Sequence, residues 1–296
     1  MKITHLKNKT YSIHPNYIDL AIYFIDNKNL ILIDTGYRAT ALDELIPFFI
    51  EKDYYVKGIL CTHSHLDHTG GNPPLVEKYH SKVYAPYVES IFSESTYNMY
   101  IVRNNFRFTA TKEQLPQFAY KIDHIIPSEA TSIELFDQSF QVIPLPGHSP
   151  YQVGYISPDN IAYLADSIIS EPLLLKTKIP YVFDVDRDLK TKKSLKNLNC
   201  DGYLLSHYGY YENIDALIDL NIHHLETKTE QLLDLLKAPH TFDTYTSHVM
   251  KQLQIKPSVA KIVYLQEMLR SFLTYYFQHD LVDVCESKGL LYIQKK

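Results

Sequence analysis

Four side chains that can bind metals stand close together in the first third of the chain. The sequence CTHSHLDHTG brings them within six residues: His63, His65, Asp67 and His68. Imidazole and carboxylate groups are natural ligands of zinc and of similar divalent cations. The preceding apolar segment, VKGILCT, predicts a short buried strand that ends in a sharp turn. In such a turn His63 and His65 can face one cation while Asp67 and His68 face a second, so the sequence predicts a metal site.

Further metal ligands must come from other parts of the chain, because one loop cannot surround two cations. Three candidates each follow a predicted strand directly: His148 in LPGHSP, Asp166 in YLADS and His207 in LLSHYG. A lone histidine or aspartate at a strand end is ordinarily only solvated, but the three together complement the first loop. We therefore expect all of these side chains to gather at the ends of strands.

Strand and helix patterns alternate along the chain up to about residue 210. We expect a hairpin at 17–36, a strand pair at 131–145 and further strands at 56–62, 82–85, 151–156, 161–165 and 203–205. Helices are expected to start in GGNP at 70–73, to fill 88–120 and to occur at 187–198. Strands interleaved with helices indicate a layered α/β architecture. Helical periodicity then dominates up to a small strand in GLLYIQKK, which predicts a domain at 1–211 and a helical extension at 212–296.

The composition is that of an ordinary folded protein, with 45% hydrophobic residues, 21% charged residues and a formal net charge of −5. A mildly acidic chain gains no general attraction to nucleic acid or to anionic lipid, so we disfavour both as partners. We find no signal peptide and no apolar run long enough to span a membrane, and we expect a cytoplasmic protein. The three cysteines, Cys61, Cys200 and Cys285, are far apart and predict neither a disulfide framework nor a zinc knuckle.

The order of these motifs resembles that of the metallo-β-lactamase superfamily. Its pattern runs from an Asp on an early strand through H-x-H-x-D-H to a later His, a later Asp and a final His. The chain matches the pattern at Asp34 in ILIDTG, His63, His65, Asp67, His68, His148, Asp166 and His207. The resemblance covers roughly residues 1 to 211. It implies an αββα sandwich that carries the catalytic site at one edge of its two sheets.

The resemblance also implies how the ligands divide between two cations. The first cation would be held by His63, His65 and His148, the second by Asp67, His68 and His207, and both by Asp166. Asp34 would orient a ligand without touching a metal, a role that metal sites generally require. Zinc is the favoured metal, and iron and manganese are alternatives that the same ligands accept.

The implied activity is the hydrolysis of a small ester, lactone or thioester, as in the glyoxalase II and lactonase branches. Two cations that share a water lower its pKa toward neutrality, so a bridging hydroxide is the expected nucleophile and Asp67 the candidate to take up its proton. Asp166 replaces the cysteine ligand of some β-lactamases, and His65 replaces a glutamate of flavodiiron proteins, so we disfavour both branches. A phosphodiesterase or nuclease, a mono-iron sulfur dioxygenase and a binding protein with a vestigial site are the alternatives.

Two regions are less diagnostic. The segment Phe92 to Tyr120 is rich in aromatic residues and contains Arg103 and Arg107. It is either a lid over an apolar pocket or a pair of helices that packs on the core or on a second subunit, which would make a homodimer. The extension at 212–296 resembles the helical, in some members winged-helix-like, extension of the superfamily. Its part from 241 to 296 has seven Lys and Arg against five acids, a surplus too small to argue for DNA binding.

Overall fold

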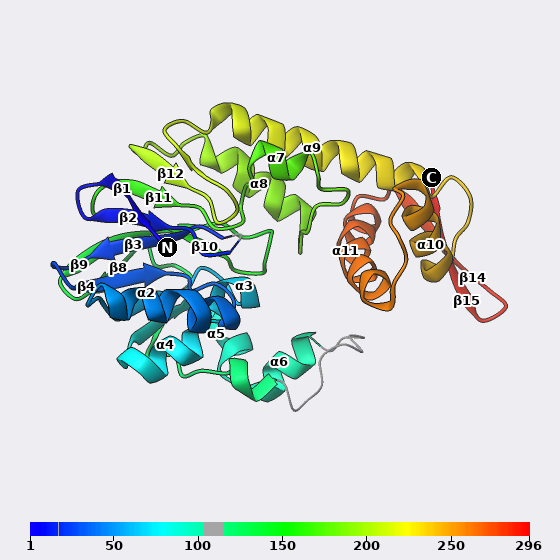
Figure 1. Ribbon diagram of the computed structural model, residues 1–296. Helices are drawn as coiled ribbons and strands as arrows, with labels where there is room; N and C mark the ends of the chain where they lie inside the picture. The colour runs from blue at the N-terminus through cyan, green and yellow to red at the C-terminus, as the bar shows by residue number, and fades with distance from the viewer. Residues whose placement is uncertain (17, 104–114) are drawn as a thin grey trace.

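Two β-sheets stack face to face, and helices cover the outer face of each sheet (Figure 1). The computed structural model describes residues 1–16, 18–103 and 115–296. In these residues the first sheet has the strand order β1-β2-β3-β4-β5-β6-β7. Its strands are β1 (Ile3–Lys7), β2 (Thr10–Ile13), β3 (Leu20–Phe24), β4 (Asn29–Ile33), β5 (Tyr55–Leu60), β6 (Lys82–Pro86) and β7 (His124–Ile126).

The second sheet has the strand order β13-β12-β11-β10-β9-β8. Its strands are β8 (Ser132–Leu135), β9 (Gln138–Pro144), β10 (Val153–Ile156), β11 (Ile161–Tyr163), β12 (Gly202–Leu204) and β13 (Tyr210–Tyr211). Neighbouring strands from β8 to β11 are antiparallel, and β11 and β12 are parallel. A parallel pair places the ends of both strands at the same edge, which matters for the site described below.

One set of helices lies on the outer face of the first sheet, and a second set lies on and beyond the outer face of the second sheet (Figure 1). The first set comprises α1 (Arg38–Thr40), the π-helical turn η1 (Ala41–Leu45), α2 (Ile46–Glu51), α3 (Leu66–Thr69), α4 (Asn72–Tyr79), α5 (Tyr87–Ser93), α6 (Thr96–Arg103) and the 3-10 turn η2 (Leu115–Phe118). The second set comprises α7 (Glu171–Leu174), α8 (Val185–Leu195), α9 (Asp215–Asp234), α10 (Phe242–Gln252) and α11 (Val259–Gln278). A hairpin of β14 (Val282–Ser287) and β15 (Leu290–Lys295) follows.

Three layers of buried apolar side chains hold the sandwich together. The outer layer on the first sheet joins Leu32 of β4 to Phe49 of α2 and Leu75 of α4. The middle layer lies between the sheets, and the third layer joins the second sheet to α7, α8 and the start of α9. Strand β4 shows the two-residue periodicity, because Leu32 faces the outer layer while Ile31 and Ile33 face the middle one. The predicted αββα sandwich is therefore confirmed.

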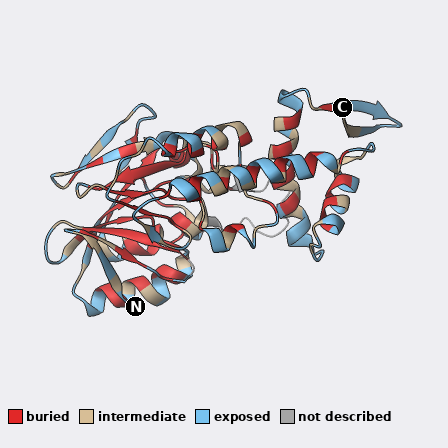
Figure 2. Cartoon of the chain, turned by 90° about the horizontal axis from the view of Figure 1, so that it is seen from above, coloured by how far each residue is buried: buried red, intermediate tan, exposed pale blue. Residues whose placement is uncertain are grey.

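The C-terminal helices form a further core, which also includes Ile179, Val182 and Val185 from the start of α8 and the segment before it. Helix α9 begins against the second sheet with Leu217 and Ile218 and ends in the further core with Leu232 and Leu233. Figure 2 shows buried residues concentrated in the strands of the sandwich, whereas the hairpin of β14 and β15 is largely exposed. Three helices followed by a hairpin are the elements that a winged-helix-like extension requires. The boundary between 1–211 and 212–296 stays a prediction.

Most of the predicted elements are confirmed. The hairpin at 17–36 corresponds to β3 and β4, and the expected strands correspond to β5, β6, β8, β9, β10, β11, β12 and β15. The helical prediction for 88–120 holds for α5 and α6, which are separated near Glu94, and for the turn η2. Phe106, Arg107 and Phe108 lie outside the described residues. Strands β1, β2, β7, β13 and β14 were not predicted, because they are short or carry polar residues on their exposed faces.

The three cysteines are free thiols: Cys61 is buried, Cys200 is half-buried and Cys285 is exposed. Burial raises the pKa of Cys61 to about 12, which keeps its thiol protonated at neutral pH. Among the helices of the described residues, none has the length and apolar character needed to cross a membrane.

Replacing Gly147→Ala is expected to destabilise the fold. Gly147 has φ +136°, and a Cβ at this position would lie 2.3 Å from the Cα of Asp188. The strained backbone and the overlap together should lower the free energy of unfolding by roughly 2–4 kcal/mol, which urea unfolding measures. Gly289→Ala is the matched control. Gly289 also has a positive φ, +76°, but a Cβ added there would have no atom within 4 Å. Equal losses in the two variants would contradict the role of this close approach.

Candidate metal centre

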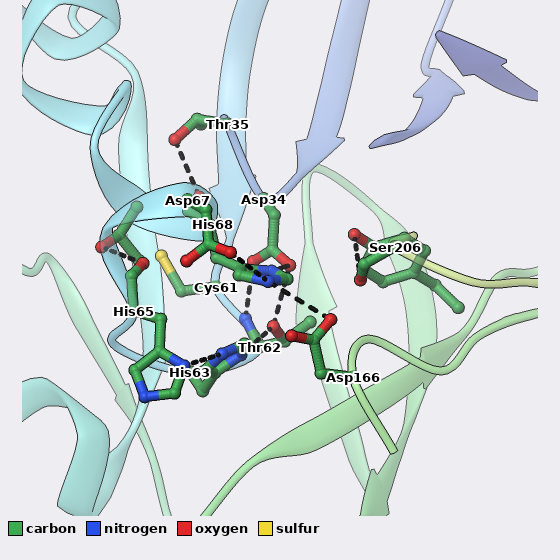
Figure 3. Close-up of polar contacts among 12 residues, drawn as sticks. Asp34, Thr35, Cys61, Thr62, His63, His65, Asp67, His68, Asp166 and Ser206 are labelled. Atoms are coloured by element: carbon green, nitrogen blue, oxygen red, sulfur yellow. Dashed lines mark hydrogen bonds and ion pairs between the residues drawn. The ribbon is translucent and has the colours of Figure 1, made fainter. Parts of the chain in front are cut away.

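Five strand ends deliver polar side chains to one edge of the sandwich. Strand β4 leads to Asp34, β5 to the loop with His63 and His65, β9 to His148, β11 to Asp166 and β12 to His207. Helix α3 follows the loop and presents Asp67 and His68 from its first turn. Figure 3 shows the side chains from β4, β5, α3 and β11 pointing toward one another. The structure thus brings together every residue that the sequence singled out for the site.

The backbone is left-handed at or beside three of these residues. The φ angle is +59° at Asp34, +49° at Ala165 directly before Asp166, and +68° at Tyr208 directly after His207. Non-glycine residues in this region cost of order 1–3 kcal/mol each and persist only where surrounding structure fixes them. The strand ends are therefore held in conformations that the local sequence alone does not favour.

Hydrogen bonds between the two sheets supply part of that support. The Tyr155 hydroxyl of β10 donates to the carbonyl of Cys61 over 2.7 Å, and the Val153 amide donates to the carbonyl of Thr62 over 3.0 Å. Both bonds fix the end of β5 immediately before His63. The loop therefore starts from a point that is tied to the second sheet.

Three imidazoles form the first group of candidate ligands. The Nδ1 atom of His65 lies 3.0 Å from Nε2 of His63 and 3.0 Å from Nε2 of His148. These nitrogens all lie within 4.8 Å of one another, as atoms that share one cation would. Burial and the neighbouring imidazoles hold the pKa of His63 well below its usual range. A neutral imidazole has a free lone pair, which is the form that binds a metal.

Two carboxylates and two imidazoles form the second group. Asp67, His68, Asp166 and His207 each offer one ligand atom, and these atoms also lie within 4.8 Å of one another. Nε2 of His207 lies 3.7 Å from Oδ2 of Asp67 and 3.6 Å from Oδ2 of Asp166. Nε2 of His68 lies 3.4 Å from Oδ1 of Asp166. The two groups meet at Asp166, whose Oδ2 is also 3.3 Å from Nε2 of His148.

Charge in the second group favours a cation. Burial opposes ionisation of Asp166, but His68, His207 and His148 outweigh it and hold the pKa of that carboxyl well below its usual range. Burial likewise opposes the charged form of His207, but Asp166 and Asp67 outweigh it and raise the pKa of that imidazole to about 10. Buried negative charge is thus balanced by protons on imidazoles. A metal cation supplies the same positive charge and displaces those protons.

Two buried atoms of this group support the same conclusion. Nε2 of His68 and Oδ1 of Asp166 are buried and make no hydrogen bond. Buried polar atoms ordinarily have a hydrogen-bond partner. Two such atoms that face the same space without one are therefore suited to coordinate an ion. The residues present therefore fit a divalent metal.

Asp34 holds the second group without belonging to it. Its Oδ2 is 2.7 Å from Nδ1 of His68 and also accepts from the Thr62 hydroxyl, and its Oδ1 accepts from the Thr62 amide. With Nδ1 engaged in this way, the lone pair of the other ring nitrogen is directed into the cluster. The Thr62 hydroxyl lies 2.9 Å from Nδ1 of His63, so the contacts of Asp34 extend to the first group as well.

A cavity of about 1480 Å³ adjoins the cluster and extends to α11. Asp67 and His148 line it on the sandwich side, and Tyr181 and Tyr264 line it further out. The Tyr181 hydroxyl lies 3.4 Å from Nε2 of His65, and its ring stacks on Tyr264 with centroids 6.0 Å apart. Tyr181 was not predicted from the sequence. It stands in an irregular segment between α7 and α8, where no periodicity or spacing marks it.

Comparison with known proteins identifies the class. The family model described as the metallo-beta-lactamase superfamily matches residues 20–208, more than half of the chain. The chain belongs to this superfamily, as its motifs predict. These findings, together with relatives that are named as hydrolases, support the predicted class of metal-dependent hydrolase.

Two curated relatives are more specific. The chain is 25% identical to hydroxyacylglutathione hydrolase GloC of Haemophilus influenzae over 195 residues, which cover 64% of this chain and 84% of that protein. It is 28% identical to hydroxyacylglutathione hydrolase of Aliivibrio fischeri over 158 residues, which cover 53% of this chain and 50% of that protein. The chain thus spans about half the length of the second relative.

Solved structures extend the likeness in fold over nearly the whole chain. A metallo-beta-lactamase family protein from Thermus thermophilus superposes with a TM-score of 0.69 at 17% identity, covering 94% of each chain. A beta-lactamase domain protein from Burkholderia ambifaria gives a TM-score of 0.69 at 13% identity and covers 99% of this chain and 93% of its own. At these identities the likeness establishes the fold, including the helical extension.

Replacing Asp34→Asn should weaken metal binding by the cluster. The amide nitrogen cannot accept a hydrogen bond, so either the Thr62 amide or His68 loses its acceptor, and the support of the cluster is weakened in both cases. The affinity for zinc is expected to fall about 10–100-fold, which an equilibrium zinc titration measures. Asp159→Asn is the control, because Asp159 accepts hydrogen bonds from Lys9 and Thr10 and touches none of the candidate ligands. Equal affinities in Asp34→Asn and the wild type would refute this role.

Proposed function

We propose that the chain is a dinuclear metallohydrolase that acts on a small thioester, ester or lactone. His63, His65 and His148 would hold the first cation, and Asp67, His68 and His207 would hold the second. The observation that carries the proposal is the position of Asp166. Its Oδ1 faces His68, and its Oδ2 faces both His148 and His207, which is where a carboxylate that bridges two cations belongs.

The cations contribute the activation and the residues contribute the positioning. When bound, a pair of divalent cations supplies hydroxide from a shared water near neutral pH and offsets negative charge on the substrate oxygen. Zinc is the favoured metal for both sites, and histidine and carboxylate ligands also bind iron and manganese. Burial lowers the pKa of His63 and of His148 in the first group, which favours their neutral forms, and Asp34 keeps Nδ1 of His68 engaged.

Asp67 is the proposed proton acceptor. Its side chain is 25% exposed and lines the cavity, so it meets both the cluster and the substrate space. Burial and the Asp67 and Asp166 carboxylates raise the pKa of Tyr37, which lines the same cavity. The Tyr37 phenol therefore keeps its proton and can donate a hydrogen bond to a substrate carbonyl or to a leaving group.

The relatives favour a thioester among the candidate substrates. Both curated relatives described above are named hydroxyacylglutathione hydrolase, which is a thioester hydrolase. The cavity beside the cluster is large enough for a small-molecule acyl thioester, and its tyrosine walls suit an amphipathic one. A cytoplasmic location is part of this proposal and is supported by the free cysteines. The homodimer stays a prediction.

Replacing His65→Ala should remove the first cation and most of the turnover. The first cation would keep two imidazoles and its share of Asp166, one ligand fewer than in the wild type, so it should be held too weakly to stay bound through purification. Elemental analysis is expected to give about one cation per chain instead of two, with turnover of a model thioester lowered by at least about 10²-fold. His124→Ala is the control, since His124 stacks on Tyr84 outside the cluster. Unchanged turnover in His65→Ala would contradict the assignment.

A screen of the wild type separates the alternative activities. Thioesters, lactones and phosphodiesters are assayed side by side, and metal content and oxygen uptake are measured on the same preparation. The proposal expects two cations and acyl hydrolysis. One iron per chain with oxygen uptake would instead indicate a sulfur dioxygenase, and activity confined to phosphodiesters would indicate a phosphodiesterase or nuclease.

Replacing Tyr264→Ala should affect substrate binding more than chemistry. Tyr264 stacks on Tyr181 and lines the cavity away from the cluster. The contacts that it makes with the substrate should therefore be the same in the enzyme–substrate complex and in the transition state. KM for the best thioester is expected to rise roughly 5–20-fold while kcat changes less than about threefold. Phe277→Ala on the same helix is the control, because Phe277 is 67% exposed. A fall in kcat with KM unchanged would refute this role of Tyr264.

A further inference from the structure

A buried acid on α5 stands outside the set of candidate ligands. Glu89 is only 1% exposed and lies behind the loop that carries the first histidines. A carboxylate loses much of its hydration when it is buried, so it must be compensated by strong hydrogen bonds. Its contacts therefore show what it is there to hold.

Glu89 accepts four hydrogen bonds, two from each of two loops. Its Oε2 accepts from the Ser64 amide over 3.1 Å and from the Ser64 hydroxyl over 2.7 Å. Its Oε1 accepts from the Ser149 hydroxyl over 2.8 Å and from the Tyr151 amide over 2.8 Å. Each carboxylate oxygen thus serves one loop, and the rigid carboxylate sets the distance between them.

These two loops carry the whole first group of candidate ligands. Ser64 stands between His63 and His65, and Ser149 follows His148. The second group comes from α3 and from the ends of β11 and β12, and its fixed point is the contact of His68 with Asp34. Two buried acids therefore support the cluster: Glu89 holds both loops of the first group, whereas Asp34 contacts His68 of the second group directly and reaches the first group only through Thr62.

We propose that Glu89 is a positioning residue that sets the spacing of the three imidazoles and thereby the affinity of the first cation site. The inference rests on the proposed function, because it takes the first group to be a metal site. Only a carboxylate accepts four hydrogen bonds in this geometry. In Glu89→Gln the amide nitrogen cannot accept from the backbone amide of the loop that it faces, so that hydrogen bond is lost and the loop is held less firmly.

Cobalt titration of Glu89→Gln tests the inference, because Co²⁺ absorbs visibly and its spectrum depends on its ligands. Two variants give the reference spectra: His65→Ala without the first site, and His207→Ala with a damaged second site. At the first site, Glu89→Gln is expected to bind Co²⁺ about 10–100-fold more weakly than the wild type. At one equivalent its spectrum should match that of His65→Ala and differ from that of His207→Ala.

Two less disruptive variants test the same inference if Glu89→Gln fails to fold. Ser149→Ala removes one donor to Glu89 and should weaken the same site roughly threefold or more. Ser90→Ala is its matched control, since the Ser90 hydroxyl is buried on the same helix but donates to the carbonyl of Tyr87. Ser90→Ala is expected to bind both Co²⁺ ions as the wild type does.

The outcomes separate this inference from the function on which it rests. A wild type that binds no Co²⁺ would overturn the proposed function and the inference together. A wild type with two sites, beside a Glu89→Gln variant that keeps its first site at full affinity, would overturn the inference alone. Equal weakening of both sites, with a lowered thermal midpoint, would also overturn it, because it would show a general structural role.

Discussion

The structure depends on two carboxylates, the buried Asp166 and the half-buried Asp67, which stand among imidazoles at the edge of a β-sandwich. Negative charge in such a place is unstable unless positive charge lies beside it. Protons on His68 and His207 supply that charge in part, because Asp166 and Asp67 outweigh the effect of burial and raise the pKa of both imidazoles. A divalent cation supplies it more fully, because it also satisfies lone pairs that make no hydrogen bond. Charge balance thus connects the composition of the cluster to its chemistry.

The packing of the sandwich stabilises this arrangement of charged groups. The contributing strands are short, and β4, β11 and β12 are buried almost throughout. The polar residues follow the strands within a few residues, so the apolar layers fix the positions of groups that repel or strain one another. The left-handed backbone at Asp34, Ala165 and Tyr208 is tolerated for the same reason. Glu89 and Asp34 then set the fine geometry from behind, each by accepting hydrogen bonds from donors close to a ligand. The candidate ligands are thus positioned first by core packing, then by the strand ends and, at the shortest range, by the buried acids.

Much of this could be predicted from the sequence, because the information is local. Ligand types cluster in HSHLDH, and His148, Asp166 and His207 each follow an apolar run, so a strand-end rule finds them. Other features depend on contacts between distant segments. Glu89 is an ordinary acid on a helix, and only the fold shows that its partners lie 25 and 60 residues away. Strands β1 and β7 escaped prediction because β1 has a mostly exposed face and β7 has only three residues.

Helix α9 has a consequence for how substrate preference can change in this protein. It is a single rigid rod of 20 residues that is anchored at one end under the second sheet and at the other in the C-terminal core. Such a rod is about 30 Å long, so a tilt of about 5° moves its far end by about 2–3 Å. That movement would carry α11 toward or away from the histidine cluster and alter the width of the space between them. Substitutions remote from every ligand therefore offer a mechanical route by which the enzyme could acquire bulkier or smaller substrates while its reaction centre stays intact.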